Sequence, residues 1–193
     1  MKENRVLYKL IKVIYSFLLK VLYRPKVIGT DNIPKEGSVI FAGNHRHAFD
    51  PVVVMSNTNR IVHFMAKEEL FKGLHGILFK KLDIIPVYRS RQDNTSSIVQ
   101  ANNILKSGGT VGIFPEGTRN RTEKDLLNFK TGTIRIAKDT GSMIIPFAIR
   151  GKYKILKKGL EIKFGTPINV YNMEIQEANK YLYEQVLKLY KGI

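Results

Sequence analysis

Short apolar runs alternate along this chain with longer segments that carry apolar residues at helical spacing, and this alternation restricts the possible folds more than any other feature. Buried strands appear as continuous apolar runs, whereas surface helices show a period of about 3.6 residues. Strands that alternate with helices predict an α/β domain, in which a mixed, largely parallel sheet is flanked by helices. We expect strands at 39–42, 60–66, 82–87, 110–114, 143–149 and 160–164, and helices at 67–81, 93–106, 128–139 and 174–190, with another helix opening at Pro51.

The loop of residues 44–51, Asn-His-Arg-His-Ala-Phe-Asp-Pro, joins the first of these strands to the helix expected at Pro51. Open α/β sheets usually bind ligands in loops at the carboxyl ends of their strands. His45 and Asp50 are close enough in sequence for a turning loop to bring the carboxylate back to the imidazole. An Asp bonded to one ring nitrogen leaves the other nitrogen free to take a proton. The loop therefore predicts a general base, His45, oriented by Asp50, that acts on a hydroxyl carried by the substrate.

Two other interpretations of this loop stay open at the level of sequence. Asp50 followed by Pro51 also fits a helix start, with Asp as the N-cap and Pro at the first helical position. Metal binding is the second, because His45, His47 and Asp50 are all residue types that ligate metals. No cluster that supplies a fourth ligand is evident in the sequence, so we expect no metal site.

A second loop, at residues 114–121, reads Phe-Pro-Glu-Gly-Thr-Arg-Asn-Arg and also follows an apolar run. An Asn-His-x4-Asp box followed by Phe-Pro-Glu-Gly-Thr-Arg resembles the glycerophospholipid acyltransferase family, in particular its 1-acylglycerol-3-phosphate acyltransferases. The segments 85–89 and 144–149 resemble the second and fourth motifs of that family, so the resemblance covers roughly residues 26–170 in the expected order. The extra histidine, His47, and Asn120, where the family commonly has Ser, depart from the pattern.

The resemblance implies transfer of a fatty acyl group to the sn-2 hydroxyl of a lysophosphatidic acid, which gives phosphatidic acid. The acyl donor would be a thioester of coenzyme A or of acyl carrier protein, and no cofactor beyond this co-substrate is implied. In this interpretation His45 removes the hydroxyl proton, while Asp50 orients the imidazole and stabilises its cationic form. The chain has no Gly-x-Ser-x-Gly elbow and no Gly-x4-Gly-Lys-Ser/Thr loop, which argues against serine-hydrolase and nucleotide-phosphate chemistry.

The phosphate of such an acceptor requires positive charge and hydrogen-bond donors near the reacting hydroxyl. Arg119 is the leading candidate because a guanidinium grips phosphate through two parallel hydrogen bonds. In the same loop, Gly117 lets the backbone approach a ligand closely, and Glu116 is expected to hold the glycerol hydroxyl or to fix Arg119. The remaining candidates for substrate binding are Thr118, Lys67, Arg89 and Lys130. For the three basic residues the alternative is an ordinary solvated charge.

Composition limits the partners of the chain. With 193 residues we expect one domain. The absence of cysteine excludes disulfides, thiol catalysis and cysteine-ligated metal. Lys and Arg number 32 against 16 Asp and Glu, a formal charge of +16, which predicts an anionic partner such as a membrane surface or nucleic acid.

The segment 5–23 favours the membrane. Its basic and small polar residues share one narrow helical stripe, and the remaining arc is apolar or aromatic. Such a helix lies in the membrane interface with its lysines toward the headgroups, and each basic residue near an anionic leaflet adds about 1 kcal/mol. The alternatives are a helix packed on the domain core and, less in keeping with the sequence, a secretory signal. A spanning helix is not expected, because lysines interrupt the ~20 apolar residues required. The stripe consists of Arg5, Lys9, Lys12, Ser16 and Lys20.

Taken together, these patterns divide the chain into a membrane-association helix at 1–26 and an acyltransferase catalytic domain at 27–193. We expect a peripheral or monotopic protein at the cytoplasmic face of a membrane. One rival is an acyltransferase of the same family that acts on another lysophospholipid, a glycolipid or an amino-lipid. The more distant rival is a non-catalytic basic protein that binds anionic membrane or nucleic acid, which would show a strongly salt-dependent affinity. We expect no nucleic-acid partner.

Overall fold

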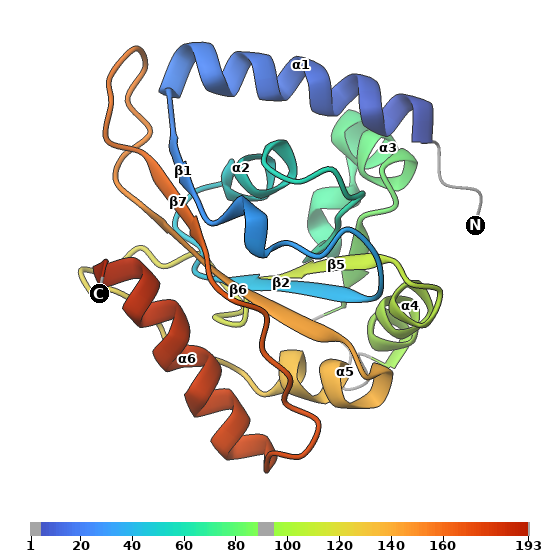
Figure 1. Cartoon of the computed structure of the whole chain (residues 1–193). Coiled ribbons are helices and arrows are strands. Elements are labelled where there is room, and N and C mark those ends of the chain that lie inside the picture. Colours follow the sequence, from blue (N-terminus) through green and yellow to red (C-terminus); the bar gives the residue numbers. More distant parts are fainter. Residues whose placement is uncertain (1–4, 89–94, 193) are drawn as a thin grey trace.

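The computed structural model describes residues 5–88 and 95–192, and its centre is a seven-stranded sheet in the order β1-β7-β6-β2-β5-β3-β4 (Figure 1). Neighbouring strands are parallel except for the antiparallel pair β6–β7. The predicted mixed, largely parallel sheet flanked by helices is therefore confirmed. The strands are β1 Lys26–Ile28, β2 Val39–Gly43, β3 His63–Lys67, β4 Ile85–Val87, β5 Thr110–Ile113, β6 Met143–Arg150 and β7 Glu161–Phe164.

Helices cover both faces of this sheet. On one side lie α1 and α2, and on the other lie α5 and α6 (Figure 1). The helices are α1 Arg5–Tyr23, α2 Asp50–Ser56, α3 Gly73–Lys81, α4 Thr95–Lys106, α5 Gly132–Thr140 and α6 Ile175–Lys191, and two 3-10 turns are η1 Thr30–Asn32 and η2 Glu68–Phe71.

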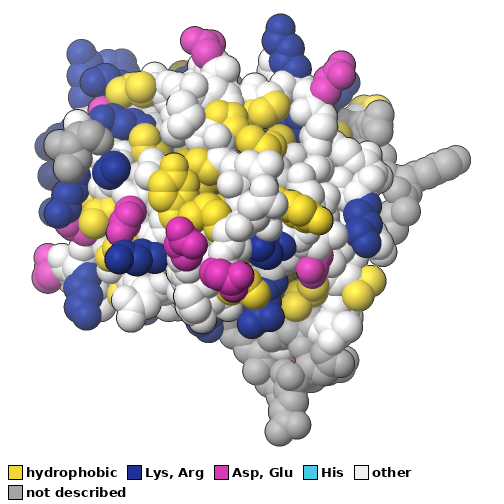
Figure 2. Space-filling view, turned by 60° about the horizontal axis from the view of Figure 1, so that its bottom comes forward, with side chains coloured by type: hydrophobic (Ala, Val, Ile, Leu, Met, Phe, Trp, Pro, Cys, Tyr) yellow, Lys and Arg dark blue, Asp and Glu magenta, His cyan; other side chains and the backbone are white. Residues whose placement is uncertain are grey.

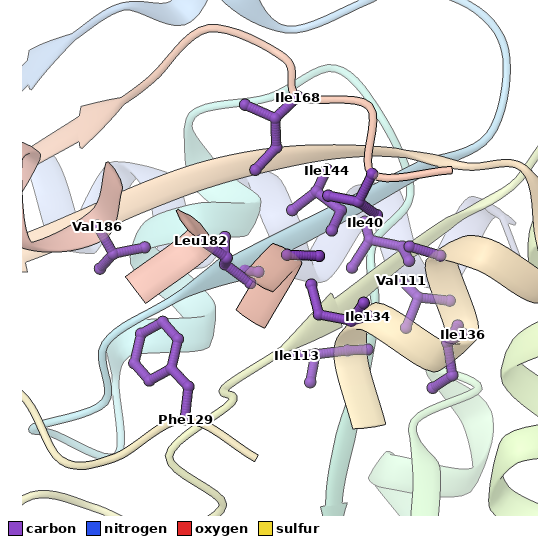
Figure 3. Close-up of a cluster of buried hydrophobic side chains, with 14 of the residues drawn as sticks. Ile40, Val111, Ile113, Phe129, Ile134, Ile136, Ile144, Ile168, Leu182 and Val186 are labelled. Carbon is purple, nitrogen blue, oxygen red and sulfur yellow. The ribbon is translucent and has the colours of Figure 1, made fainter. Parts of the chain in front are cut away.

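The central strands are buried on both faces, which explains why they appear in the sequence as unbroken apolar runs. In β2, Val39 and Phe41 pack toward α1 and α2, while Ile40 and Ala42 pack toward α4, α5 and α6. Figure 3 shows the second layer, in which Leu182 and Val186 of α6 meet the isoleucines of β2, β6 and α5. Two apolar layers thus hold the sheet between its helices, and the loops at the ends of the strands are not needed for this core.

The first helix packs on α2 and turns part of its polar stripe inward (Figure 1). The N–H of Val62 donates to the Tyr8 hydroxyl at 2.9 Å, and the ammonium of Lys12 donates to the carbonyl of Thr58. Burial lowers the pKa of Lys12, and the Ser16 hydroxyl is also buried. The expectation that the lysines of this stripe face lipid headgroups is therefore wrong for Lys12, which faces the body. The exposed side is apolar: Val6, Leu10, Val13, Ile14, Phe17, Leu18 and Val21.

Within the described residues, no helix is both long enough and apolar enough to cross a bilayer.

Several predicted boundaries differ from the structure. The strand β1 lies in a stretch without an expected element, because three residues at a sheet edge give no pattern of their own; it forms by pairing with β7, far along the chain. The helix expected at 67–81 is split into η2 and α3. The strand expected at 60–66 begins at His63. Arg60 precedes it in a loop, where its guanidinium binds neighbouring segments. It donates to Thr110 Oγ1 at 2.5 Å and to the carbonyls of Pro34, Gly37 and Gly108.

Candidate active site

The loop after β2 turns so that His45 and Asp50 meet. His45 Nδ1 lies 2.9 Å from Asp50 Oδ2, and the same oxygen accepts the N–H groups of Arg46 at 2.7 Å and His47 at 2.8 Å. Asp50 is fully buried, whereas the His45 side chain is 18% exposed. A proton on Nδ1 shared with the carboxylate leaves Nε2 as the nitrogen able to accept another. The pair thus has the geometry of a base and its orienting acid.

The structure answers the capping interpretation of this loop directly. Asp50 is the first residue of α2, and the N-cap position belongs to Phe49, without a side-chain cap bond. The carboxylate cannot cap the helix because it is turned back toward the N–H groups of the loop that precedes it. Among the described residues, the structure contains no group of three or more His, Cys, Asp or Glu suited to a metal ion.

The second carboxylate oxygen of Asp50 has a partner that sequence inspection missed. The Tyr153 hydroxyl, from the connection between β6 and β7, donates to Asp50 Oδ1 at 2.6 Å. Burial, and then the neighbouring charge of Asp50, raise the pKa of Tyr153 well above its usual range, so this hydroxyl keeps its proton and acts as a donor. The Tyr153 ring also stacks on His47, with centroids 4.2 Å apart. No motif around Tyr153 signals this role, because the bond spans 103 residues of chain.

The Phe-Pro-Glu-Gly-Thr-Arg loop frames His45 from the adjacent strand β5. Phe114 stacks against the His45 ring with centroids 4.0 Å apart and planes inclined by 16°. The N–H of His45 donates to Glu116 Oε1 at 2.7 Å, and the His45 carbonyl accepts the N–H of Asn120 at 2.6 Å. Ring and backbone of His45 are therefore both held by this loop. The two boxes that the sequence singles out form one site.

Glu116 is buried and binds backbone on both sides. Besides His45, its second oxygen accepts the N–H of Leu127 at 2.8 Å. Burial raises the pKa of Glu116, and these two N–H bonds oppose that rise. The carboxylate thus joins the His45 loop to the segment that leads into α5. A direct role of Glu116 toward the glycerol hydroxyl or toward Arg119 stays a prediction.

Gly117 and Lys130, both predicted to bind substrate, come together. Gly117 has a φ of +69°, and a Cβ built there would lie 3.0 Å from Cε of Lys130. The backbones of the two segments also meet, because the N–H of Lys130 donates to the carbonyl of Pro115 at 2.9 Å. Thr118 and Arg119 are exposed at the tip of this loop. The positive φ favours glycine at position 117, and the close approach of Lys130 brings its ammonium beside the backbone of this loop.

Of the remaining predicted phosphate ligands, Lys67 follows another strand at the same edge of the sheet. Lys67 is the last residue of β3 and is exposed. Since β3 is parallel to β5, Lys67 lies at the edge from which the Phe114 loop emerges. Arg89, which follows β4, lies outside the described residues. The carboxyl ends of β2, β3 and β5 thus bring basic groups and the His45–Asp50 pair to one edge.

Two residues of the first box have structural roles that the sequence did not reveal. Asn44 is buried and exchanges two hydrogen bonds with the backbone of Ile149, at 2.7 and 2.8 Å, and so continues the pairing of β2 with β6. The Arg46 guanidinium donates to the carbonyls of Thr122 and Lys124 and to the Tyr190 hydroxyl of α6. These contacts fix both sides of His45. Their partners are so distant in sequence that local patterns cannot predict them.

In this α/β protein a buried carboxylate contacts a partly exposed imidazole at the carboxyl ends of parallel strands, an arrangement that suits general-base chemistry. The acyltransferase family model matches residues 24–150, and the chain belongs to this family. It is 31% identical over 150 residues to the 1-acyl-sn-glycerol-3-phosphate acyltransferase of Bacillus subtilis, a match that covers 75% of this chain and 73% of that protein.

Other relatives agree with this family. The chain is 34% identical over 147 residues to the 1-acyl-sn-glycerol-3-phosphate acyltransferase of Borreliella burgdorferi, which corresponds to 75% of this chain and 58% of that longer protein. The crystal structure of the 1-acyl-sn-glycerophosphate acyltransferase from Thermotoga maritima matches with a TM-score of 0.77 at 24% identity, over 100% of this chain and 83% of that chain. This likeness shows a common fold.

Proposed function

We propose that this protein is a 1-acylglycerol-3-phosphate O-acyltransferase that forms phosphatidic acid from lysophosphatidic acid. The observation that carries the proposal is the 2.9 Å contact between His45 Nδ1 and Asp50 Oδ2, in a loop held by the Phe-Pro-Glu-Gly-Thr-Arg segment. The names of the Bacillus and Borreliella relatives supply the acceptor. The acyl donor is a thioester of coenzyme A or of acyl carrier protein.

In the proposed reaction, His45 Nε2 takes the proton of the sn-2 hydroxyl as its oxygen attacks the thioester carbonyl. A C–O bond forms, the carbonyl becomes a tetrahedral oxyanion, and the imidazolium is stabilised by Asp50. Collapse of the intermediate breaks the C–S bond, and the leaving thiolate takes from His45 the proton that came from the hydroxyl. General-base catalysis of this kind contributes about 10²–10⁴-fold in rate. Holding donor and acceptor together supplies much of the remainder.

Basic side chains lie at this edge of the sheet, where we expect the phosphate of the acceptor to bind. We propose Arg119 and Lys130 as its principal ligands, with Lys67 and Arg89 as further contributors and Gly117 and Thr118 as backbone and hydroxyl donors. Lys130 is supported by its packing on Gly117, and Arg119 by its exposed position in the same loop. A guanidinium and an ammonium together match the charge of a phosphate monoester.

We further propose that α1 lies on a membrane surface and presents the enzyme to its lipid acceptor. Its inward side, with Tyr8 and Leu19, is already buried against the body, while the opposite side exposes seven large apolar residues. An exposed apolar face of this kind marks an interaction site. Basic residues at its border favour an anionic leaflet.

The test is acyl transfer from palmitoyl-coenzyme A and from palmitoyl acyl carrier protein to lysophosphatidic acid, in detergent micelles, beside a panel of other lysolipids. The expected result is efficient transfer to lysophosphatidic acid that His45→Ala reduces at least 100-fold, in line with the loss of a general base. Asn103→Ala, an exposed change in α4, is the control and should retain activity. Transfer only to another lysolipid would assign a different acceptor, and full activity of His45→Ala would contradict the mechanism.

A further inference from the structure

The connection between β6 and β7, residues 151–159, has a surface unlike that of an ordinary solvated loop. At its tip, Ile155 and Leu156 are 61% and 62% exposed. Four exposed lysines surround them, and the sequence has no acidic residue between Asp139 and Glu161. An apolar tip flanked by exposed lysines is suited to an anionic lipid surface, where the aliphatic groups leave water and the ammonium groups meet headgroups. The lysines are Lys152, Lys154, Lys157 and Lys158.

This connection, the 151–159 hairpin, lies beside the carboxyl end of α1, as Figure 1 shows. The N–H of Leu156 donates to the carbonyl of Leu22 at 2.5 Å, and the rings of Tyr153 and Tyr23 meet edge to face with centroids 5.5 Å apart. The apolar tip therefore adjoins the helix whose outer side is already apolar. Two neighbouring elements, distant in sequence, together extend one surface.

The opposite side of the molecule has a different surface. When the bottom of Figure 1 is turned forward, acidic and basic side chains are intermixed over that face (Figure 2). In the 151–159 hairpin, by contrast, the four lysines flank the two aliphatic residues and no acidic residue lies among them. Charge complementarity therefore selects an anionic bilayer, and the two exposed aliphatic residues favour a bilayer over nucleic acid, for which aromatic stacking would be expected.

We propose that the 151–159 hairpin docks on anionic bilayers as a second membrane contact beside α1. The contact is coupled to chemistry, because the same hairpin carries Tyr153, whose hydroxyl holds Asp50. Docking of the tip would hold Tyr153, a positioning residue, between the membrane and the His45–Asp50 pair. This inference rests on the proposed membrane association of α1.

The cysteine-free chain allows a direct test, because one introduced cysteine carries one environment-sensitive fluorophore. The label is placed by Ile155→Cys in the hairpin, by Phe17→Cys on α1, and by Tyr171→Cys as the control. Tyr171 is 62% exposed, as open as Ile155, but lies beside α5 on the other side of the sheet. Vesicles of phosphatidylglycerol and phosphatidylcholine should shift the emission of the labels at 155 and 17 to the blue and leave the label at 171 unchanged. Pure phosphatidylcholine should give a much smaller shift.

A second measurement separates local charge from net charge. Lys157→Gln with Lys158→Gln should lower the vesicle partition coefficient about 25-fold, since each lysine at an anionic surface contributes about fivefold. The control pair Lys106→Gln with Lys180→Gln makes the same change in net charge on exposed positions of α4 and α6, and should have little effect.

A blue shift at 17 without one at 155, or equal effects of the two lysine pairs, would overturn the inference and leave the role of α1 intact. Absence of any shift in protein that sediments with vesicles would overturn both membrane contacts. If nonspecific DNA shifts the label at 155 more than the vesicles do, the partner is nucleic acid and the inference is wrong. Acyl transfer in detergent micelles is measured on the same variants, so loss of the proposed enzymatic function is seen separately.

Discussion

Two histidines, His45 and His63, stand at opposite ends of the parallel strands and differ in partner and in access. His45 follows the carboxyl end of β2, and its Nδ1 meets a carboxylate. His63 opens β3 at the amino end, and its Nδ1 lies 3.0 Å from the carbonyl oxygen of Asp83. The His45 side chain is 18% exposed, whereas His63 is 2% exposed. The Asp50 carboxylate orients the His45 ring, and only the partly exposed ring can meet a substrate. A bonded imidazole is thus not by itself a catalytic base.

Removing the charge of Asp50 should have the largest effect on this comparison. Asp50→Asn replaces the charged partner of His45 by a neutral one, and we expect kcat/KM to fall about 10²–10⁴-fold. The amide also cannot reproduce all four bonds that the carboxylate accepts. Steady-state kinetics on folded protein measures the effect. If kcat/KM of this variant stays within twofold of wild type, the carboxylate does not orient a base.

His63→Ala is the structural counterpart. Loss of a buried ring leaves a cavity and an unpaired carbonyl at Asp83, so we expect the free energy of unfolding to fall by about 2–4 kcal/mol. Because His63 lies at the amino end of β3, activity per folded molecule should be unchanged. Urea unfolding and titrated-activity measurements check the two parts. A large loss of kcat at unchanged stability would make His63 part of the site and remove the contrast.

Tyr153→Phe should produce a smaller, purely positional loss. A hydrogen bond to a charged group is typically worth about 1.5–3 kcal/mol, but the three other donors to Asp50 remain. We expect kcat to fall about tenfold, with KM nearly constant. The matched control is Tyr171→Phe, which removes an exposed hydroxyl. An effect on unfolding alone, with kcat preserved, would show that Tyr153 only packs the hairpin.

The smallest effect should come from the titration of Glu116. Its pKa is raised by burial above the ordinary 4.5, so the folded protein keeps this proton better than the unfolded chain does. The stability contributed by that proton is complete below the pKa of Glu116 in the unfolded chain. It is lost as the pH rises through the pKa of Glu116 in the folded protein. The stability advantage of wild type over Glu116→Gln should therefore shrink as the pH rises above 4.5, with a slope of at most about 1.4 kcal/mol per pH unit. Urea unfolding of both proteins across this range measures it, and an advantage that grows instead would show that the two N–H bonds outweigh burial.

Much of the fold was accessible from the sequence because its central strands are buried on both faces and so form continuous apolar runs. The contact between His45 and Asp50 was accessible for a related reason, since both belong to one short loop. Elements created by distant partners were not. The strand β1 has no pattern of its own, and Lys12 faces inward because Thr58, 46 residues away, offers a carbonyl.

The candidate site follows the same division. Sequence motifs singled out Gly117, and the structure adds that Lys130 packs against it. The partners of Asp50 and Arg46 in the folded chain, Tyr153 and Tyr190, lie 103 and 144 residues away. Such contacts depend on how the β6–β7 connection and α6 return to the first loop. Local spacing contains no information about that return.

The most direct test of the central claim is a double-mutant cycle in kcat/KM with His45→Ala and Asp50→Asn, measured with lysophosphatidic acid as the acceptor. If Asp50 acts through His45, the double variant should be no slower than His45→Ala alone, because the carboxylate has nothing left to orient. Losses that multiply would show that the two residues act independently, and would contradict a His45–Asp50 general base.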